Sequence, residues 1–193
     1  MHKKINPKNL LSDTHGAVII EFVFIVFIMI TFMKVLISVS EHYSTIGKLD
    51  RISYSLSGII RERTRLFYGD NKLTEEQVSK LKMLADKMLS NSGLSKPDVA
   101  ITIETVNFNP TQSPTVENKV IDDTKSLSFS IGSCEPDKPL KELTQLSAFS
   151  NAGRWMPLYQ VTLCLPTSTW YDTLFGQGGN TISIKSSAIT IER

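Results

Sequence analysis

Residues 17–33 read AVIIEFVFIVFIMITFM, and the segment continues through Lys34 and VLISVS as far as Glu41. A helix needs roughly 20 predominantly apolar residues to cross the hydrocarbon core of a bilayer. Ala17 to Ser40 is about 24 residues, or about 36 Å of helix at 1.5 Å per residue. The segment is apolar on all sides, as expected for contact with lipid or with other helices. It therefore predicts one transmembrane helix over 17–40, with Lys34 late enough to extend its ammonium group toward the membrane surface.

The composition of the whole chain is that of an ordinary folded protein. The 193 residues are 41% hydrophobic and 21% charged, with a net charge of +2. So small a charge gives no reason to expect a nucleic-acid partner. Lys3, Lys4 and Lys8 outweigh Asp13 before the apolar segment. Because cytoplasmic flanks are enriched in Lys and Arg, residues 1–16 are expected in the cytoplasm and the C-terminal part across the membrane.

Two simple interpretations of the apolar segment remain open. One is an uncleaved signal anchor. The other is a secretory signal cut after Ser38-Val39-Ser40, which has the small-x-small form that signal peptidase accepts. The apolar stretch exceeds the usual 7–15 residues of such a signal, and Glu21 interrupts it. A carboxylate inside a transmembrane helix costs free energy unless it is paired, so Glu21 is a candidate functional residue.

The residues around Glu21 form a known pattern. Residues 16–22 read GAVIIEF, which resembles the G-x-x-x-x-E-[FY] processing site of type IV prepilins and pseudopilins. In that family an inner-membrane prepilin peptidase cuts after the glycine. The resemblance assigns Gly16, Ala17, Glu21 and Phe22 to this site, and makes residues 1–16 a cytoplasmic prepilin leader. It also implies that Glu21 docks the subunit by pairing with a newly exposed α-amine, on this chain or a neighbouring one.

The pattern D-x-x-G-A-V-x-x-E-F, starting at Asp13, is most similar to the TadE/TadF pseudopilins of tight-adherence (Tad, or Flp-type) pili. The stretch GRWMPLYQVTLCLP at 153–166 is closer to the TadF branch. The resemblance implies a minor pseudopilin of the bacterial inner membrane that acts in assembly or priming of an adhesion pilus. Its implied partners are the prepilin peptidase, other pilins and pseudopilins, the inner-membrane assembly platform and membrane lipid. The alternative is an uncleaved, signal-anchored periplasmic interaction or sensor-input domain, which would keep residues 1–16.

Residues 41–92 are predicted to form a periplasmic helical stalk and a second helix. A stripe of apolar residues at three- and four-residue steps continues the first helix, until Gly69-Asp70-Asn71 ends it. The stripe comprises Val39, Tyr43, Ile46, Leu49, Ile52, Leu56, Ile59 and Ile60. Thr74-Glu75-Glu76-Gln77 is a capping box that opens the second helix. Asn91 to Gly93 closes that helix, whose predicted inner face is Val78, Leu81, Leu84, Met88 and Leu89.

Residues 93–193 are predicted to be a β-rich periplasmic domain. Alternating apolar residues predict half-buried strands at 99–103, 127–131 and 159–165, and the polar, proline-marked stretch 109–126 reads as a surface loop. Pro139 suits the first position of a short helix that carries Leu140, Leu143 and Leu146. Between 181 and 192 the isoleucines change parity, which predicts a bulge or a break near Ser186-Ser187. The fold class is therefore α+β and pilin-like: a long transmembrane-plus-stalk helix, a second helix, then a small antiparallel sheet.

The two cysteines, Cys134 and Cys164, both fall in the part placed outside the cytoplasm. In an oxidising periplasm a disulfide between them is expected, and it would tie neighbouring strands. Two free buried thiols are the alternative. A zinc site is not expected, because neither cysteine has a second zinc-binding residue at a suitable spacing.

The sequence offers no catalytic constellation. His2 and His15 lie in the leader, and His42 lies at the membrane edge. The GQGG stretch at 176–179 lacks the Lys-Ser/Thr of a phosphate loop and reads as a turn, and Asp122-Asp123 reads as a solvated loop pair. We therefore expect no enzyme activity, no catalytic or metal-binding residue and no cofactor. Two aromatic groups, Trp155-Met156-Pro157 and Trp170 to Phe175, are expected in the core, or, if exposed, as protein-protein contact patches.

Overall fold

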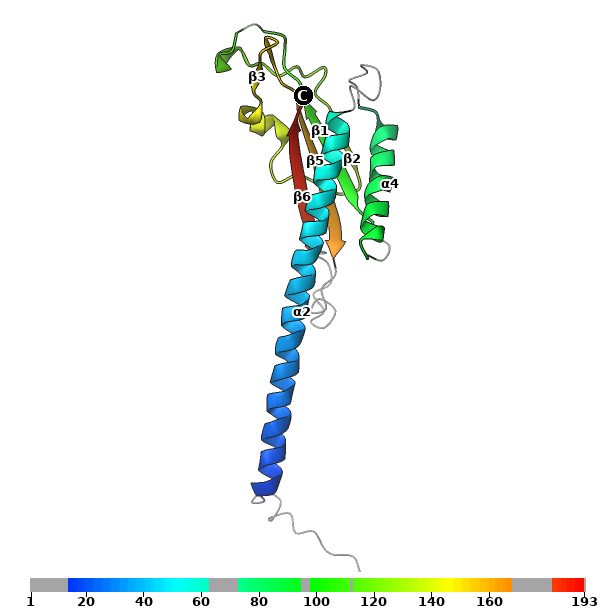
Figure 1. Cartoon of the computed structure of the whole chain (residues 1–193), viewed down its shortest axis with the longest axis vertical. Coiled ribbons are helices and arrows are strands. Elements are labelled where there is room, and N and C mark those ends of the chain that lie inside the picture. The colour runs from blue at the N-terminus through cyan, green and yellow to red at the C-terminus, as the bar shows by residue number, and fades with distance from the viewer. Residues whose placement is uncertain (1–13, 63–72, 95–97, 112, 168–181, 193) are drawn as a thin grey trace, which may run out of the picture. The chain divides into compact units, whose positions relative to one another are not determined.

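The computed structural model describes the chain apart from residues 1–13, 63–72, 95–97, 112, 168–181 and 193 (Figure 1). It divides into two compact units, Met1–Ser44 and Thr45–Arg193. The elements follow the predicted α+β order. They are α2 (Thr14–Arg61), α4 (Glu75–Asn91), β1 (Ala100–Val106), η1 (Val116–Asn118), β2 (Ser128–Ile131), η2 (Leu140–Leu146), β3 (Phe149–Ser150), β4 (Arg154–Trp155), β5 (Leu158–Thr167) and β6 (Ile182–Ile191).

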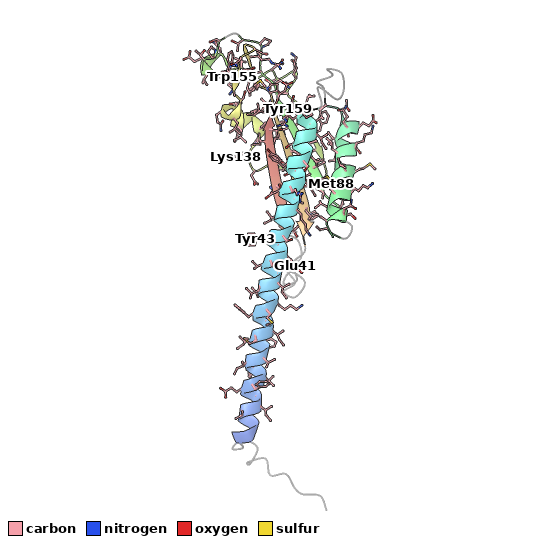
Figure 2. All side chains as sticks on the ribbon, in the orientation of Figure 1. Glu41, Tyr43, Met88, Lys138, Trp155 and Tyr159 are labelled. Atoms are coloured by element: carbon pink, nitrogen blue, oxygen red, sulfur yellow. A yellow bond between two sulfur atoms is a disulfide. The ribbon has the colours of Figure 1, made fainter. Side chains whose placement is uncertain are left out.

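The first unit contains the apolar part of α2. From Val18 to Ser44 every side chain is exposed except that of Ser38, which is half-buried. Figure 2 shows side chains projecting from all sides of this stretch, with Glu41 and Tyr43 near its end. The helix is long and apolar enough to cross a membrane. Among the described residues it is the one helix with this length and composition, which fits a single-pass membrane anchor.

The last part of α2 belongs to the second unit and is a core helix. Leu49, Ile52, Leu56 and Ile60 are buried, because apolar residues at three- and four-residue steps share one face of a helix. The predicted stripe is therefore only partly core: Val39, Tyr43 and Ile59 are exposed. The helix ends at Arg61, earlier than predicted, and Gly69-Asp70-Asn71 lie outside the described residues.

Helix α4 begins and ends with the capping interactions that its sequence predicts. The Thr74 hydroxyl accepts from the Gln77 amide, and the Gln77 side chain accepts from the Thr74 amide. At its end Gly93 adopts φ +93°, and the Leu94 amide donates to the Leu89 carbonyl, which closes the last turn. The predicted inner face is wrong at one position. Leu84 is exposed, whereas the buried residues of the helix are Val78, Ala85 and Leu89.

The sheet has four antiparallel strands in the order β2-β1-β5-β6. One face packs against the core residues of α2 and α4, which lie side by side against it (Figure 1). The prediction that the strands are half-buried is wrong for β1 and β5. Thr102 and Thr105 in β1, and Gln160 and Thr162 in β5, are buried as well as the isoleucine, valine and leucine side chains. Both faces of the central strands are therefore covered.

Strand β6 contains neither the bulge nor the break that the sequence suggested. It pairs with β5 residue for residue, from Thr167 opposite Ile182 to Leu158 opposite Ile191. The parity change has another cause. On the buried face Ile184 is followed by Ser186, Ala188 and Thr190, which lie against α2: the Ser53 and Ser186 hydroxyls are 2.8 Å apart, and Thr190 Oγ1 donates to the Ser57 carbonyl at 3.3 Å. Small side chains here let the helix approach the strand closely.

The opposite face of the sheet carries a second apolar cluster formed by Val106, Leu140 and Leu158. Leu140 comes from η2, which is a 3-10 helix, with Pro139 as its N-cap residue rather than its first helical residue. Leu146 is exposed, so only part of the predicted apolar face is used. The loop predicted at 109–126 includes the short η1 turn, and a bridge between Phe108 and Ile121 holds it.

Candidate functional site

The predicted processing segment lies at the start of α2. Because the helix begins at Thr14, Gly16 and Ala17 are already in helical conformation. Glu21 lies four residues after Ala17, which is one helical turn and a rise of about 6 Å. The geometry therefore places a carboxylate within reach of an amine at residue 17, if the chain were cut after Gly16.

Glu21 and Phe22 are both exposed, and Phe22 has 65% of its surface accessible. The described residues of this chain provide no hydrogen-bond or ion-pair partner for the Glu21 carboxylate. The side chains around it, such as Val18 and Ile25, are apolar and equally exposed. An unpaired carboxylate on an apolar helix is costly in lipid. The arrangement is therefore suited to a partner on another chain or at a new N-terminus.

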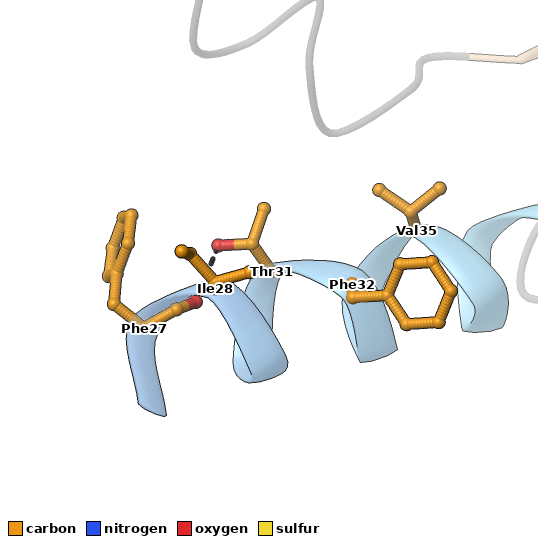
Figure 3. A pocket seen from close by; sticks show the side chains of 5 residues that line it. All are labelled: Phe27, Ile28, Thr31, Phe32 and Val35. Atoms are coloured by element: carbon orange, nitrogen blue, oxygen red, sulfur yellow. Dashed lines mark hydrogen bonds between the residues drawn. The ribbon is translucent and has the colours of Figure 1, made fainter. Parts of the chain in front are cut away.

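A shallow groove further along the helix, by contrast, carries no carboxylate. It is lined by Phe27, Ile28, Thr31, Phe32 and Val35 (Figure 3). The hydroxyl of Thr31, its one polar side chain, donates to the Phe27 carbonyl at 2.9 Å. The polar side chain of the groove is thus hydrogen-bonded within its own helix, as contact with lipid requires. This surface can contact lipid or other helices, but it holds no reactive group.

The two cysteines form the predicted disulfide, with Cα atoms 5.5 Å apart. Its position differs from the prediction. Cys134 follows β2 and Cys164 lies in β5, but β1 separates these two strands. The bridge therefore crosses β1 on the outer face of the sheet, where Thr102 Oγ1 of β1 donates to the Cys134 carbonyl. Both cysteines are buried, so the bond is structural rather than an accessible redox site.

One polar hollow lies beside the start of β1. Its volume is about 340 Å³, and its lining includes Lys82, Asp98, Ser133 and Ser183. The Lys82 ammonium group donates to Asp98 at 3.0 Å and to Asp86 at 3.2 Å. Chiefly the hydrogen bond to Asp98 raises the pKa of Lys82, so the lysine stays charged. A fully paired lysine is neither a base nor a nucleophile, and the hollow contains no catalytic arrangement.

Trp155 is buried rather than part of a contact patch. It packs edge-on against Phe149, and the Lys119 ammonium group lies 4.3 Å from its ring centre. Lys119 Nζ also donates to the carbonyls of Thr144 and Ser147, and burial lowers its pKa. No local sequence pattern predicts these contacts of Lys119, because its partners lie far from it in the chain. The second aromatic group, Trp170 to Phe175, and the predicted turn at 176–179 lie outside the described residues.

The expectation that Asp122 and Asp123 are both solvated is wrong for Asp122. It is buried rather than solvated, and it accepts from the amide and hydroxyl of Thr124. Its neighbour Asp123 is exposed and pairs with Lys141 at 2.7 Å. Within the described part of the chain, no group of three or more His, Cys, Asp or Glu side chains is placed to hold a metal ion.

Comparison with known families decides the relationship. The model of the TadF family, described as "Putative tight adherence pilin protein F", matches residues 9–193. The chain belongs to the TadF family. No curated protein and no solved structure shows significant similarity to the chain.

Membership covers both units, including the region between the two motifs that carried the resemblance. It confirms the prediction of a tight-adherence pilin-like protein, and the long apolar helix and the disulfide fit this class. The TadF family is a family of pilin proteins, whose role is structural, and membership implies interaction with other pilus components. The roles given to Gly16, Ala17, Glu21 and Phe22, and the choice between TadE-type and TadF-type roles, remain predictions.

Proposed function

We propose that this chain is a minor pseudopilin that acts in assembly or priming of a Tad pilus and has no enzymatic activity. Residues 1–16 are a cytoplasmic leader, which prepilin peptidase removes after Gly16. Residues 17–40 span the bacterial inner membrane, and residues 41–193 lie in the periplasm. TadF family membership supports a role in the pilus, and the lysines before the apolar segment support this orientation.

The position of Glu21 is the observation on which the proposal depends. From Ala17 to Ser40 it is the only acidic residue in the sequence, and its carboxylate has no partner among the described residues. A helix selected only as an anchor has no reason to keep this cost. Cleavage after Gly16 would create an ammonium group at Ala17, one helical turn away. That cation, on this chain or on a neighbour, would neutralise the carboxylate in a medium where an unpaired charge is strongly disfavoured.

The disulfide supports the periplasmic placement of residues 41–193. Disulfides persist in oxidising compartments and are rare in the bacterial cytoplasm. Among the described residues of the second unit, Lys82 is paired with Asp86 and Asp98, and both cysteines are held in a buried disulfide. We infer that this domain works by binding other subunits and the assembly platform.

The first test is the N-terminus of the membrane-extracted protein. We expect its sequence to begin at Ala17 and its intact mass to lack residues 1–16. In Gly16→Ser the full chain should accumulate, because the peptidase site requires a residue without a side chain. Gly47→Ser is the matched control: this glycine is in the same helix and has open space around it, so processing should be normal. A native chain that begins at Met1 would establish the uncleaved signal anchor, and one that begins at Glu41 a secreted protein.

The second test separates assembly from anchoring. Glu21→Ala removes a costly carboxylate, so membrane residence should be unchanged while co-purification with other pilins and piliation are lost. Glu21→Gln keeps the shape but not the charge, and should behave like Glu21→Ala. Val23→Ala changes a neighbouring exposed position and should leave both properties intact. Normal piliation in Glu21→Ala would remove the role proposed for this residue.

A further inference from the structure

The sheet has two open edges of unequal length. In β6 the even-numbered residues pair with β5, as the hydrogen bond from the Glu192 amide to the Pro157 carbonyl indicates for that register. Backbone groups alternate sides along an antiparallel strand. The amides and carbonyls of Ser183, Lys185, Ser187, Ile189 and Ile191 therefore point away from β5. No other described segment hydrogen-bonds to them.

The other edge is β2, where the same rule applies. The Leu127 and Thr105 backbones exchange two hydrogen bonds, so the odd-numbered residues face β1, and Ser128 and Ser130 face outward. Proteins usually protect long edges with proline, a bulge or several charges. From 183 to 191, β6 has no proline and no bulge, and Lys185 is its only charged residue. Such an edge is a template for another strand.

The direction of α2 restricts which strand can be added. Ser53 contacts Ser186, and Ser57 contacts Thr190, so α2 and β6 run in the same direction. If two β6 strands paired with each other in antiparallel fashion, residues 45–61 of the two α2 helices would run in opposite directions, with Thr45 at opposite ends of the pair. Thr45 directly follows the membrane segment in the chain, so two chains anchored in one membrane must both have it at the end that faces the membrane. An antiparallel partner must therefore come from a strand that runs opposite to α2.

Strand β2 meets this condition. In a sheet of four antiparallel strands the two edge strands run in opposite directions. A second copy that is shifted sideways, without rotation, thus presents β2 antiparallel to β6. The outward-facing residues of both strands carry their side chains on the same, outer face of the sheet. The pleat therefore continues across the junction, and both α2 helices keep the same direction.

The helices allow the same sideways shift of the second copy. Four strands spaced about 4.8 Å apart are about 19 Å wide, and two helices spaced 8–10 Å apart are about 16–20 Å wide. The sheet and the helix layer therefore repeat with a similar step. On α2, Ile59 lies toward α4 and Ser57 toward β6. At 100° per residue, Tyr54 lies on the β6 side, beyond Ser57, where it is 68% exposed. On α4, Met83 is 69% exposed; at 100° per residue it lies about 100° or more around the helix from Leu81 and Leu84, which face α2. The shift brings these two sides together.

We propose that copies of this chain associate side by side in the membrane, with the β6 edge of one copy pairing with the β2 edge of the next. The Tyr54 and Met83 side chains would meet above this junction. A methionine sulfur packs favourably on an aromatic ring, so this contact would stabilise the pair. Such a head-to-tail interface uses two different surfaces and can continue from copy to copy. It goes beyond the proposed function, because it depends on neither cleavage after Gly16 nor pairing by Glu21.

Cysteine cross-linking in membranes tests this arrangement with the full-length chain. Ser128 and Ser187 are exposed, on the outer face of β2 and β6. The native cysteines are bonded to each other, so a short bis-maleimide reacts only with introduced thiols. We expect a ladder of dimers, trimers and larger species from the Ser128→Cys/Ser187→Cys chain. Co-expressed single variants should give dimers only, and each single variant alone should give monomer.

Two results would overturn the proposal. Cross-linked dimers of Ser187→Cys alone would mean that β6 pairs with itself, and monomers in every arm would mean that the edges do not meet. Lys185→Pro in the double-cysteine chain sharpens the test. Its amide points away from β5, so proline removes an edge donor and leaves the internal ladder intact. The ladder of cross-links should then disappear while Cys134 and Cys164 stay unreactive. Cross-links that persist in this folded variant would exclude β6 as the interface.

Discussion

Helix α2 contains two stretches of apolar residues, of which the first is exposed and the second is buried. From Val18 to Ile37 isoleucine, phenylalanine and valine side chains are exposed on every side, whereas in the last part of the helix Leu49, Ile52, Leu56 and Ile60 are buried. The content of apolar residues does not explain this difference, but their distribution does. The first stretch is apolar all round, which suits lipid, and the second confines its apolar residues to one face.

Polar residues follow the same division. In the second stretch Ser53 and Ser57 lie on the buried side and find partners in β6. In the first stretch the Thr31 hydroxyl is satisfied inside the helix, and the Glu21 carboxylate is not satisfied within the described chain. A polar group that has a partner on its own chain belongs to the fold. One that has none points to a partner outside it, which is why Glu21 carries the functional proposal.

The largest expected effect comes from truncating the packed stretch. Leu56 is fully buried, so Leu56→Ala should lower the free energy of unfolding of the second unit by about 2–5 kcal/mol, from lost burial and a residual cavity. Leu36→Ala, in the exposed stretch of the same helix, is the control and should leave that free energy unchanged. Urea unfolding in detergent, followed by tryptophan fluorescence, measures both. Equal losses in the two variants would contradict the division of the helix.

The next effect concerns the disulfide, which belongs entirely to the second unit. Replacing Cys134 and Cys164 together by Ser should cost about 3 kcal/mol of unfolding free energy, since the bridge closes a loop with a sequence separation of 30 residues. The same measurement in the wild type with reductant should approach the value of the double variant. Membrane residence should not change, because the exposed stretch of α2 decides it. A loss of the protein from the membrane would show that anchoring depends on the folded domain.

Much of this architecture was predictable because local rules decided it. The apolar segment predicted α2, the capping box at Thr74 predicted α4, and the cysteines predicted their bond. In each case the deciding groups are close in sequence or have only one possible partner. The processing motif is equally local, but what it does depends on a peptidase, so its geometry leaves it a prediction.

The errors occurred where packing between distant segments decided the outcome. The parity change in β6 suggested a bulge, but its cause is the close approach of Ser53 and Ser57, which requires small residues on that face. On α4, Ala85 and not Leu84 belongs to the core cluster that α2, α4 and the sheet form together. Asp122 looked solvated because it lies in a polar loop, but its amide donates to the carbonyl of Asn107, which is distant in the sequence. No local pattern contains this information.

A smaller effect tests the contact between α2 and β6. Ser53→Ala leaves the buried Ser186 hydroxyl without its partner at 2.8 Å, and this should cost about 1–2 kcal/mol. Ser55→Ala is the matched control, because Ser55 is exposed and bonds only to the Arg51 carbonyl of its own helix. Its effect should lie within about 0.5 kcal/mol of zero. Restoration of stability in Ser53→Ala/Ser186→Ala would confirm that the unpaired hydroxyl, not lost volume, causes the loss.

The smallest effect compares two carboxylates, one in each region. The hydrogen bond from the Thr124 hydroxyl is the main cause that lowers the pKa of Asp122; burial opposes it, and the Thr124 amide and Lys125 add to it. A carboxyl group whose pKa is lowered by folding stabilises the fold above its unfolded pKa of about 3.9, and loses that contribution as the pH falls through its folded pKa.

Thr124→Val removes the hydroxyl but keeps the shape. Its unfolding free energy should fall below that of the wild type near neutral pH, and the two curves should converge in acid. Glu21→Gln should leave this pH dependence unchanged, because Glu21 has no partner in the second unit. A constant difference between Thr124→Val and the wild type at every pH would show that the hydroxyl acts by packing and not through the carboxylate.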